Sequence, residues 1–209
     1  SPMSRGLGDV YKRQVSYETY VQKLVLNGFR IAVCEQVESA EEARKRGHKA
    51  IVNREVVRVI TQGTITEDGL LPKAASYLVA ISLIEKERGN LDAKANNPNS
   101  KAVIGIAVAD ISTGEFFIRE ANLKNLATEL TKISPSELII TENLRSQNDA
   151  YQILSEYQNI SISYPASFFD VKQAENKIME FYEISSLASL PYLKEHHKAA
   201  IGGLLEYIM

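Results

Sequence analysis

The first part of the chain shows a helical hydrophobic pattern that gives way to strand-like runs. Apolar residues recur at intervals of three and four positions, which predicts a helix with one buried stripe. This stripe consists of Tyr17, Tyr20, Val21, Leu24 and Val25. Asn27-Gly28 predicts the end of the helix, because both residues tolerate a left-handed backbone conformation. The apolar run at 31–34 then predicts a short buried strand.

A charged segment separates this strand from a second one. Ser39 followed by Glu42 is a capping-box pattern, which predicts a short helix that begins here and ends at Gly47. The β-branched run at 56–60 predicts the next strand. Because helix, strand, helix and strand follow one another closely, we expect a small α/β layer.

The pattern from residue 76 onward predicts a second sheet. Apolar runs at 77–84, 102–109 and 115–119 are typical of strands. The polar stretch 85–101, which contains Gly, Asn and Pro, predicts an exposed loop, and 110–114 predicts a tight turn. Strands joined in this way are expected to be antiparallel.

The period then changes to an alternation of helices and strands. The helices are expected at 123–133, 150–157, 171–184 and 194–208, and the strands at 138–140 and 160–164. Three antiparallel strands followed by such alternation have the order of a ribonuclease-H-like sheet. The predicted class is therefore α/β, with a partial small α/β domain followed by a ribonuclease-H-like domain with a mixed sheet.

Composition excludes several classes of protein. The chain has 209 residues, 44% of them hydrophobic, and a net charge of -2, so any nucleic-acid contact needs a local basic patch. Its single cysteine, Cys34, rules out an internal disulfide, and no run is long enough to cross a bilayer. We expect a cytoplasmic location. Residues 1–14 fit neither period and are interpreted as a non-native, adapter-like leader.

Several motifs together resemble the MutS family of DNA mismatch-repair proteins. CEQV follows the first predicted strand, and REVVRVITQGT forms the second. Three later segments match in order: GIAVADISTGEF, SPSELIITE and AAIGGLLEYI. The resemblance implies that 15–66 are the C-terminal part of a mismatch-recognition domain, 67–73 a linker and 74–209 the connector domain that leads toward the lever domain.

The resemblance also implies a function. Proteins of this family bind mispaired or looped-out bases in duplex DNA as homodimers, use ATP, ADP and Mg²⁺, and recruit a MutL-type partner, partly through the connector. The family's Phe-x-Glu wedge is expected before residue 15; Phe181-Tyr182-Glu183 falls in a late helix, where we expect Phe181 to pack in the core. The P-loop pattern GxxxxGK[ST] does not occur in these 209 residues. This chain is therefore predicted to have no ATPase activity, no cofactor and no catalytic residue of its own.

A cluster of cations supplies the candidate DNA contacts. Around His48, the basic side chains that we expect to touch the phosphate backbone are Arg44, Lys45, Arg46, Lys49, Arg54 and Arg58. The competing interpretation is a solvated helix and loop, partly neutralised by neighbouring glutamates.

Two other functional classes stay open. Asp110, at a strand end, could begin the metal site of a stand-alone ribonuclease-H-like nuclease, with Glu115, Glu142 or Asp170 as further carboxylates. Its simpler role is to bond the local backbone of a turn. A protein-interaction module without DNA is the third class. No metal site is predicted: Cys34 is expected to be buried, and the adjacent His196 and His197 are expected to be solvated and to point about 100° apart on a helix.

Overall fold

The protein is described by a computed structural model that covers residues 17, 19–47, 49–66, 75–85, 102–146 and 148–209. The chain divides into two compact units, Ser1–Leu71 and Pro72–Met209. The predicted leader, the linker and the expected loop at 85–101 lie outside the described residues, apart from Glu85 at a strand end.

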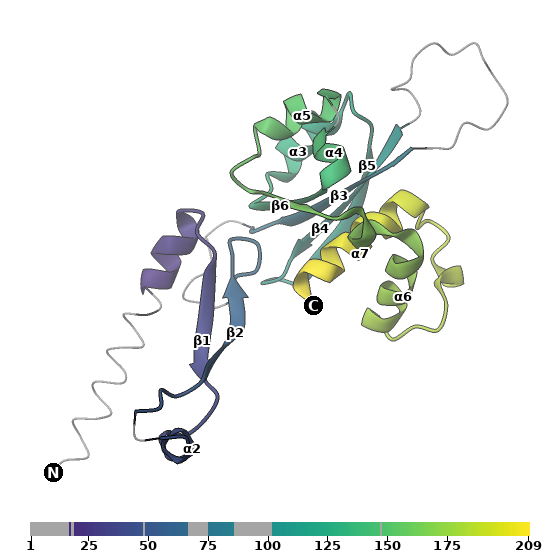
Figure 1. The fold of residues 1–209 in the computed structure, drawn as a ribbon. Coiled ribbons are helices and arrows are strands. Elements are labelled where there is room, and N and C mark those ends of the chain that lie inside the picture. The colour runs from purple at the N-terminus through teal and green to yellow at the C-terminus, as the bar shows by residue number, and fades with distance from the viewer. Residues whose placement is uncertain (1–16, 18, 48, 67–74, 86–101, 147) are drawn as a thin grey trace, which may run out of the picture. The chain divides into compact units, whose positions relative to one another are not determined.

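The first unit is built on a two-stranded antiparallel sheet. A helix over 19–26 precedes it and ends at Gly28, whose φ of 82° is left-handed, as the sequence predicts. The strands are β1 (Ile31–Gln36) and β2 (Arg54–Ile60), and α2 (Ala40–Lys45) lies in the connection between them (Figure 1). The capping box of α2 is present as predicted.

Only one face of this sheet is covered by the described residues. Val21 and Val25 of the first helix pack with Ile60, and Ile31 and Val33 are packed partly against them. The prediction that Cys34 is buried is wrong: its side chain is exposed. Cys34 is adjacent to Val33, and successive strand residues point to opposite faces, so Cys34 points away from this small core.

The second unit contains a mixed five-stranded sheet in the order β5-β4-β3-β6-β7. The strands are β3 (Leu78–Glu85), β4 (Ala102–Asp110), β5 (Glu115–Ala121), β6 (Glu137–Thr141) and β7 (Ser161–Tyr164). β4 is antiparallel to both β3 and β5, whereas β6 runs parallel to β3 and β7 parallel to β6. The predicted α/β class, with a mixed ribonuclease-H-like sheet, is confirmed.

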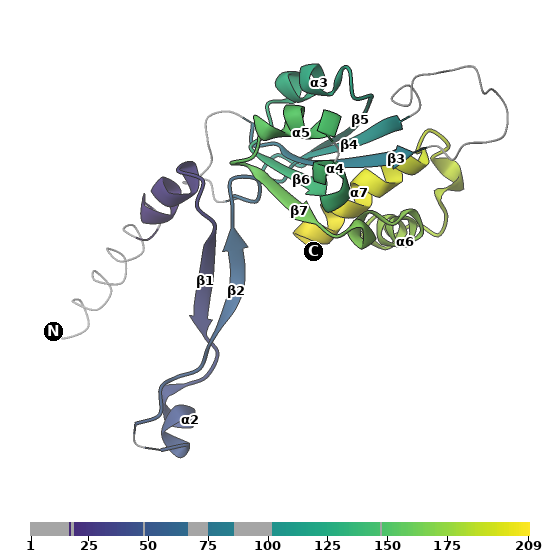
Figure 2. The ribbon, with the colours of Figure 1, turned by 45° about the horizontal axis from the view of Figure 1, so that its top comes forward.

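Helices cover both faces of this sheet. The helices are α3 (Leu126–Ile133), α4 (Glu142–Ser146), α5 (Asn148–Ser155), α6 (Val171–Phe181) and α7 (Glu195–Ile208). Figure 2 shows α3, α4 and α5 on one face and α6 and α7 on the other. β3 serves both layers, since Val79 packs in the first core and Leu78 in the second, each fully buried.

Two adjacent glycines allow α7 to pack closely. A Cβ at Gly203 would lie 2.4 Å from the ring of Phe169, and one at Gly202 would lie 2.5 Å from the Cβ of Ala174. Glycine inside a helix costs roughly 1 kcal/mol relative to alanine. The close contact with α6 and the turn before it therefore explains why glycine occupies both positions. No helix in the described part of the chain is long and apolar enough to cross a membrane.

Candidate nucleic-acid interface

The loop between β1 and β2 is held by one glutamate. The Glu38 carboxylate accepts a hydrogen bond of 2.6 Å from the backbone N–H of Asn53 and forms a salt bridge with Arg46. Arg46 also donates to the Ile51 carbonyl and to the Asn53 side chain, each at 3.3 Å. Arg46 therefore fixes the loop, and its charge is already matched by Glu38.

The helix in this loop begins with a reciprocal cap. The Ser39 Oγ accepts from the Glu42 N–H at 3.2 Å, and a Glu42 carboxylate oxygen accepts from the Ser39 N–H at 2.8 Å. The bonds from Ser39 lower the pKa of Glu42, so that this carboxylate stays charged at the start of α2. This cap positions Arg44 and Lys45 in the last turn, where cations are favoured.

The remaining cations are solvent-facing. All six predicted DNA-contact residues are exposed. Among the described residues, no salt bridge includes Arg44, Lys45, Lys49 or Arg54. These four are the side chains best able to meet a phosphate without first giving up an ion pair.

The register of the sheet separates the two strand arginines. Arg54 pairs with Gln36 and Arg58 pairs with Val33. Directly opposed residues share a face, and Gln36 and Val33 are three positions apart, so Arg54 and Arg58 lie on opposite faces. A register shift between Val33 and Cys34 adds one residue to β2 and permits this arrangement. One straight stretch of DNA backbone therefore cannot contact both arginines in the same way.

Electrostatics favours the face of Arg54. Glu35 pairs with Glu55 across the sheet, and both share the face of Val33 and Arg58. Two like charges directly opposite each other repel, and they also repel phosphate. The Arg54 face carries Gln36 and Cys34 instead, so it is the more favourable side for an anion.

The second unit uses Asp110 to hold a turn. The buried Asp110 carboxylate accepts from the N–H groups of Ser76 at 3.2 Å, Ser112 at 3.0 Å and Thr113 at 3.4 Å, and from the Ser112 hydroxyl at 2.6 Å. Burial raises the pKa of Asp110, but the hydrogen bonds from Ser112, Ser76 and Thr113 outweigh this effect and lower it. The turn closes at Gly114, whose φ is 74°.

The carboxylates expected around a nuclease metal do not converge on Asp110. Glu115 accepts from the Tyr77 hydroxyl at 3.0 Å, which raises the pKa of that tyrosine. Asp170 caps α6 by accepting from the Gln173 N–H at 2.9 Å. Among the described residues, Asp110 belongs to no group of three or more potential metal ligands. The geometry thus supports the simpler role of Asp110 as a turn residue.

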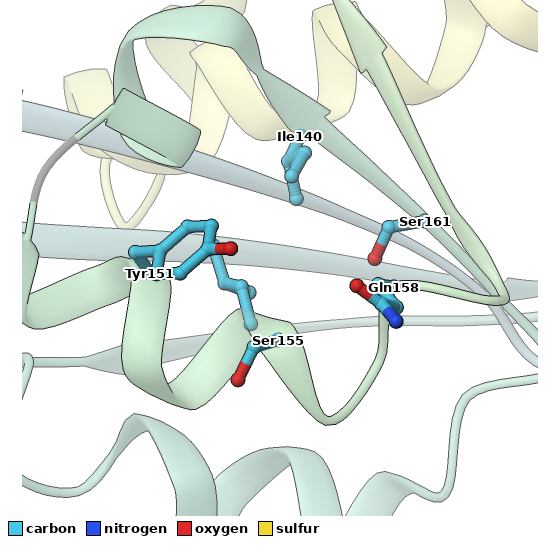
Figure 3. A pocket seen from close by; sticks show the side chains of 6 residues that line it. Ile140, Tyr151, Ser155, Gln158 and Ser161 are labelled. Atoms are coloured by element: carbon cyan, nitrogen blue, oxygen red, sulfur yellow. The ribbon is translucent and has the colours of Figure 1, made fainter.

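Two hollows lie in the described part of the second unit. The first, at Ile140 and α5, has room for about 10 Å³, which is one water (Figure 3). The second, of about 470 Å³, lies beside β5 and α3. Its lining includes the Tyr77–Glu115 hydrogen bond and a Lys132–Glu129 salt bridge of 2.7 Å. Polar groups in this groove are thus largely bonded to one another.

Two expectations about the late helices are wrong. Phe181 is 47% exposed and packs edge-on against Tyr182 instead of lying in the core. His196 and His197 are both buried, each 7% exposed, although solvated side chains were expected. Burial lowers the pKa of His197. The sequence did not predict that these two side chains come together. Residues at adjacent positions of a helix leave it in different directions, but rotation of the side chains can still bring their ring nitrogens close to each other.

The arrangement defines a class of protein: a ribonuclease-H-like α/β unit preceded by a small unit that presents exposed cations. Family models match the chain as MutS domain I over residues 13–69 and MutS domain II over residues 76–209. The chain belongs to the MutS family.

Curated relatives agree with this assignment. The DNA mismatch repair protein MutS of Anaplasma phagocytophilum is 38% identical over 194 residues, which are 92% of this chain and 22% of the relative. The MutS proteins of Ehrlichia chaffeensis and Wolbachia pipientis are each 39% identical and cover 92% of this chain, with 22% and 21% of their own lengths matched. The chain spans about a fifth of the length of these relatives.

Proposed function

We propose that this chain is part of a protein that recognises mispaired or looped-out bases in duplex DNA, and that its first unit contacts the DNA backbone. One observation carries the proposal: exposed cations that form no salt bridge with any described residue gather around α2, within the segment matched by MutS domain I. The proposed contacts are Arg44, Lys45, Lys49 and Arg54. Arg46 positions the loop, and Arg58 lies on the other face of the sheet.

Such contacts act through charge and carry no sequence information. Each phosphate neutralised by lysine or arginine releases counterions, so the affinity falls with salt in proportion to the number of contacts. Recognition of the mispair requires a group that enters the base stack, and in the family that group is the Phe-x-Glu segment. We therefore propose that this chain binds matched and mismatched duplexes alike.

The second unit is proposed to act as a connector. Its five-stranded sheet, which is covered on both faces, is suited to transmit movement between other parts of a longer protein, and it is the proposed contact for a MutL-type partner. Nucleotide binding, homodimer formation and the ATP, ADP and Mg²⁺ requirement are proposed for the full-length protein only. In this proposal the chain itself is not an enzyme and is cytoplasmic.

The test is a fluorescence-anisotropy titration of the chain against labelled duplexes over a range of salt concentrations. A variant with Lys45→Glu and Lys49→Glu should lose binding, because two contacts become repulsive. The control variant carries Lys124→Glu and Lys172→Glu in the second unit, where both side chains are exposed. Binding that the control abolishes as strongly would reflect net charge alone and would contradict the proposed surface.

The same protein samples distinguish the proposed function from the two alternative functions. Absence of salt-dependent binding would favour the protein-interaction module. Cleavage of DNA or RNA with Mg²⁺ or Mn²⁺ that is lost in Asp110→Ala, with the fold intact by circular dichroism, would favour the nuclease. A clear preference for mismatched DNA would contradict the assignment of recognition to the Phe-x-Glu segment.

A further inference from the structure

Three potential metal ligands from distant parts of the chain meet in the second unit. They are Glu120 near the end of β5 and His196 and His197 in the first turn of α7, and one ligand atom of each lies within 4.8 Å of the others. Both imidazoles are buried, whereas the Glu120 side chain is 43% exposed. The group is therefore closed on the protein side and open to solvent at the carboxylate.

The fold brings these residues together through one glycine. Gly105 pairs directly with Glu120 across β4 and β5. A Cβ at Gly105 would lie 1.9 Å from the His196 carbonyl oxygen, so only glycine lets the start of α7 lie against β4 at this point. The helix consequently presents both imidazoles beside the Glu120 carboxylate.

The spacing of the donor atoms fits a small divalent cation. His196 Nε2 lies 3.1 Å and His197 Nε2 3.9 Å from the same Glu120 oxygen. Ligands in a tetrahedral zinc site with bonds of about 2.0–2.1 Å lie about 3.3 Å apart. The first distance already meets this requirement, and the second exceeds it by about half an ångström. The two imidazole nitrogens lie within 4.8 Å of each other, so the rings must also rotate toward each other to complete the site.

The His197 ring faces the carboxylate but needs one change to bind a metal. The Lys194 backbone N–H donates to His197 Nδ1 at 3.4 Å, so the proton of the neutral ring lies on Nε2, which faces the carboxylate. Coordination through Nε2 requires this proton to move to Nδ1, and the long hydrogen bond from Lys194 is then lost. The two rings lie 4.3 Å apart at 64°, so both can approach one point without overlapping.

We propose that Glu120, His196 and His197 form a binding site for Zn²⁺. Two imidazoles and one carboxylate are a donor set that suits zinc, whereas Mg²⁺ and Ca²⁺ prefer oxygen alone. The fourth position faces solvent and takes a water or the second carboxylate oxygen. The bound ion would tie β5 to the first turn of α7, and so would stabilise the second unit.

Lys194 controls access to this site. Its ammonium lies 2.6 Å from the Glu120 oxygen that the metal would use, so ion pair and metal compete for one carboxylate. The Lys194 side chain is 59% exposed and can move into solvent, and exposed ion pairs contribute little to stability. The structure thus predicts an unusual result: removal of a positive charge at Lys194 strengthens metal binding.

The experiment is isothermal titration of the full chain with Zn²⁺, in a background with Cys34→Ser and His48→Ala. These two substitutions remove the chain's single cysteine and its third histidine, which are the strongest alternative ligands. We expect one saturable site. Glu120→Gln and His197→Gln should each weaken zinc binding by more than the roughly 10–100-fold that is lost with a residue that only orients a ligand, because each removes a ligand itself. Lys194→Met should tighten it, and Co²⁺ in place of Zn²⁺ should give visible absorption bands of a four-coordinate site.

Circular dichroism of each variant checks that it is folded. We expect Glu120→Gln to fold, because glutamine has the shape of glutamate and this side chain is partly exposed. Failure of the background chain to bind one equivalent of Zn²⁺ would overturn the proposal. So would binding that Glu120→Gln and Lys194→Met both leave unchanged, since the ion would then lie elsewhere. These outcomes are independent of DNA binding by the first unit.

Discussion

The two units achieve their structures in different ways. The second unit covers both faces of its five-stranded sheet, and the central strands bear fully buried residues such as Ile81, Ile106 and Ile139. In the described part of the first unit, only one face of a two-stranded sheet is covered, and Val56, Val57 and Val59 of β2 are each more than half exposed. Apolar burial stabilises the second unit, and polar contacts shape much of the first.

The polar contacts of the first unit are local and specific. Glu38 joins Arg46 to Asn53, Ser39 caps α2, and Thr61 bonds Thr64 both through its N–H at 3.0 Å and between the hydroxyls at 2.8 Å. Each such bond contributes only about 0.5–1.5 kcal/mol net. The comparison therefore implies that single substitutions in the core of the second unit cause the largest losses of stability. Substitutions in the first unit should cause smaller losses, which are confined to that unit.

The largest expected effect comes from one substitution made in both units. Ile106→Ala, in the middle of β4, removes a fully buried side chain and should lower the free energy of unfolding by about 2–5 kcal/mol. Ile51→Ala, where the side chain is 83% exposed, should change it by no more than about 0.5 kcal/mol. Urea unfolding followed by circular dichroism measures both. Equal losses would mean that the first unit is packed far better than its exposure indicates.

A buried carboxylate gives the next effect. Asp110→Asn should cost about 1.5–3 kcal/mol at neutral pH, because several donors lose a charged acceptor. Asp170→Asn is the matched control, since asparagine caps a helix as well as aspartate does and Asp170 caps α6. An equal loss of stability in Asp110→Asn and Asp170→Asn would contradict the conclusion that the charge of Asp110 stabilises its turn.

The pH dependence of this difference follows from the pKa of Asp110. Because the folded-state pKa lies below its ordinary value of 3.8, the ionised carboxylate contributes its full stability above that pH. The contribution is lost as the pH falls through the folded-state pKa. The gap between the unmodified chain and Asp110→Asn should thus be constant from neutral pH down to about 5 and shrink at lower pH. Unfolding curves at a series of pH values measure it.

The same contrast explains which parts of the fold the sequence could predict. Runs such as 102–109 and 138–140 were correctly identified as strands because both faces of the sheet are buried and the apolar pattern is therefore unbroken. α4 was missed, since its five residues follow β6 directly and are too few to show a period. Cys34 was misplaced, because an apolar run cannot reveal that one face of its sheet is uncovered.

The candidate site was predictable only in part. Clustered charge identified the six cations, but the salt bridge between Arg46 and Glu38 and the opposite faces of Arg54 and Arg58 depend on register and on a loop contact. The group of Glu120 with His196 joins residues 76 positions apart, and sequence spacing contains no signal for it. Such contacts arise from tertiary packing, in this case from Gly105 under α7.

A smaller effect is expected at the cap of α2. Ser39→Ala removes the acceptor for the Glu42 N–H and should lower the stability of α2 by about 1 kcal/mol. Hydrogen exchange by NMR should show faster exchange of the α2 amides, with the amides of the second unit unchanged. Ser39→Asp, which retains a cap, should restore protection. Loss of protection that spreads into the five-stranded sheet would show that the two units do not unfold separately.

The smallest effect on stability, and the most direct test of the proposed interface, is at Lys45. Lys45→Gln should change the free energy of unfolding by no more than about 0.5 kcal/mol, because the side chain is exposed and takes part in no salt bridge among the described residues. If Lys45 contacts a phosphate, the slope of log affinity against log salt should decrease in magnitude by about 1. Lys124→Gln in the second unit makes the same charge change and should leave the slope as it is. A slope that responds equally to both lysines would reveal a diffuse attraction of the whole chain, and one that responds to neither would place the DNA contact away from α2.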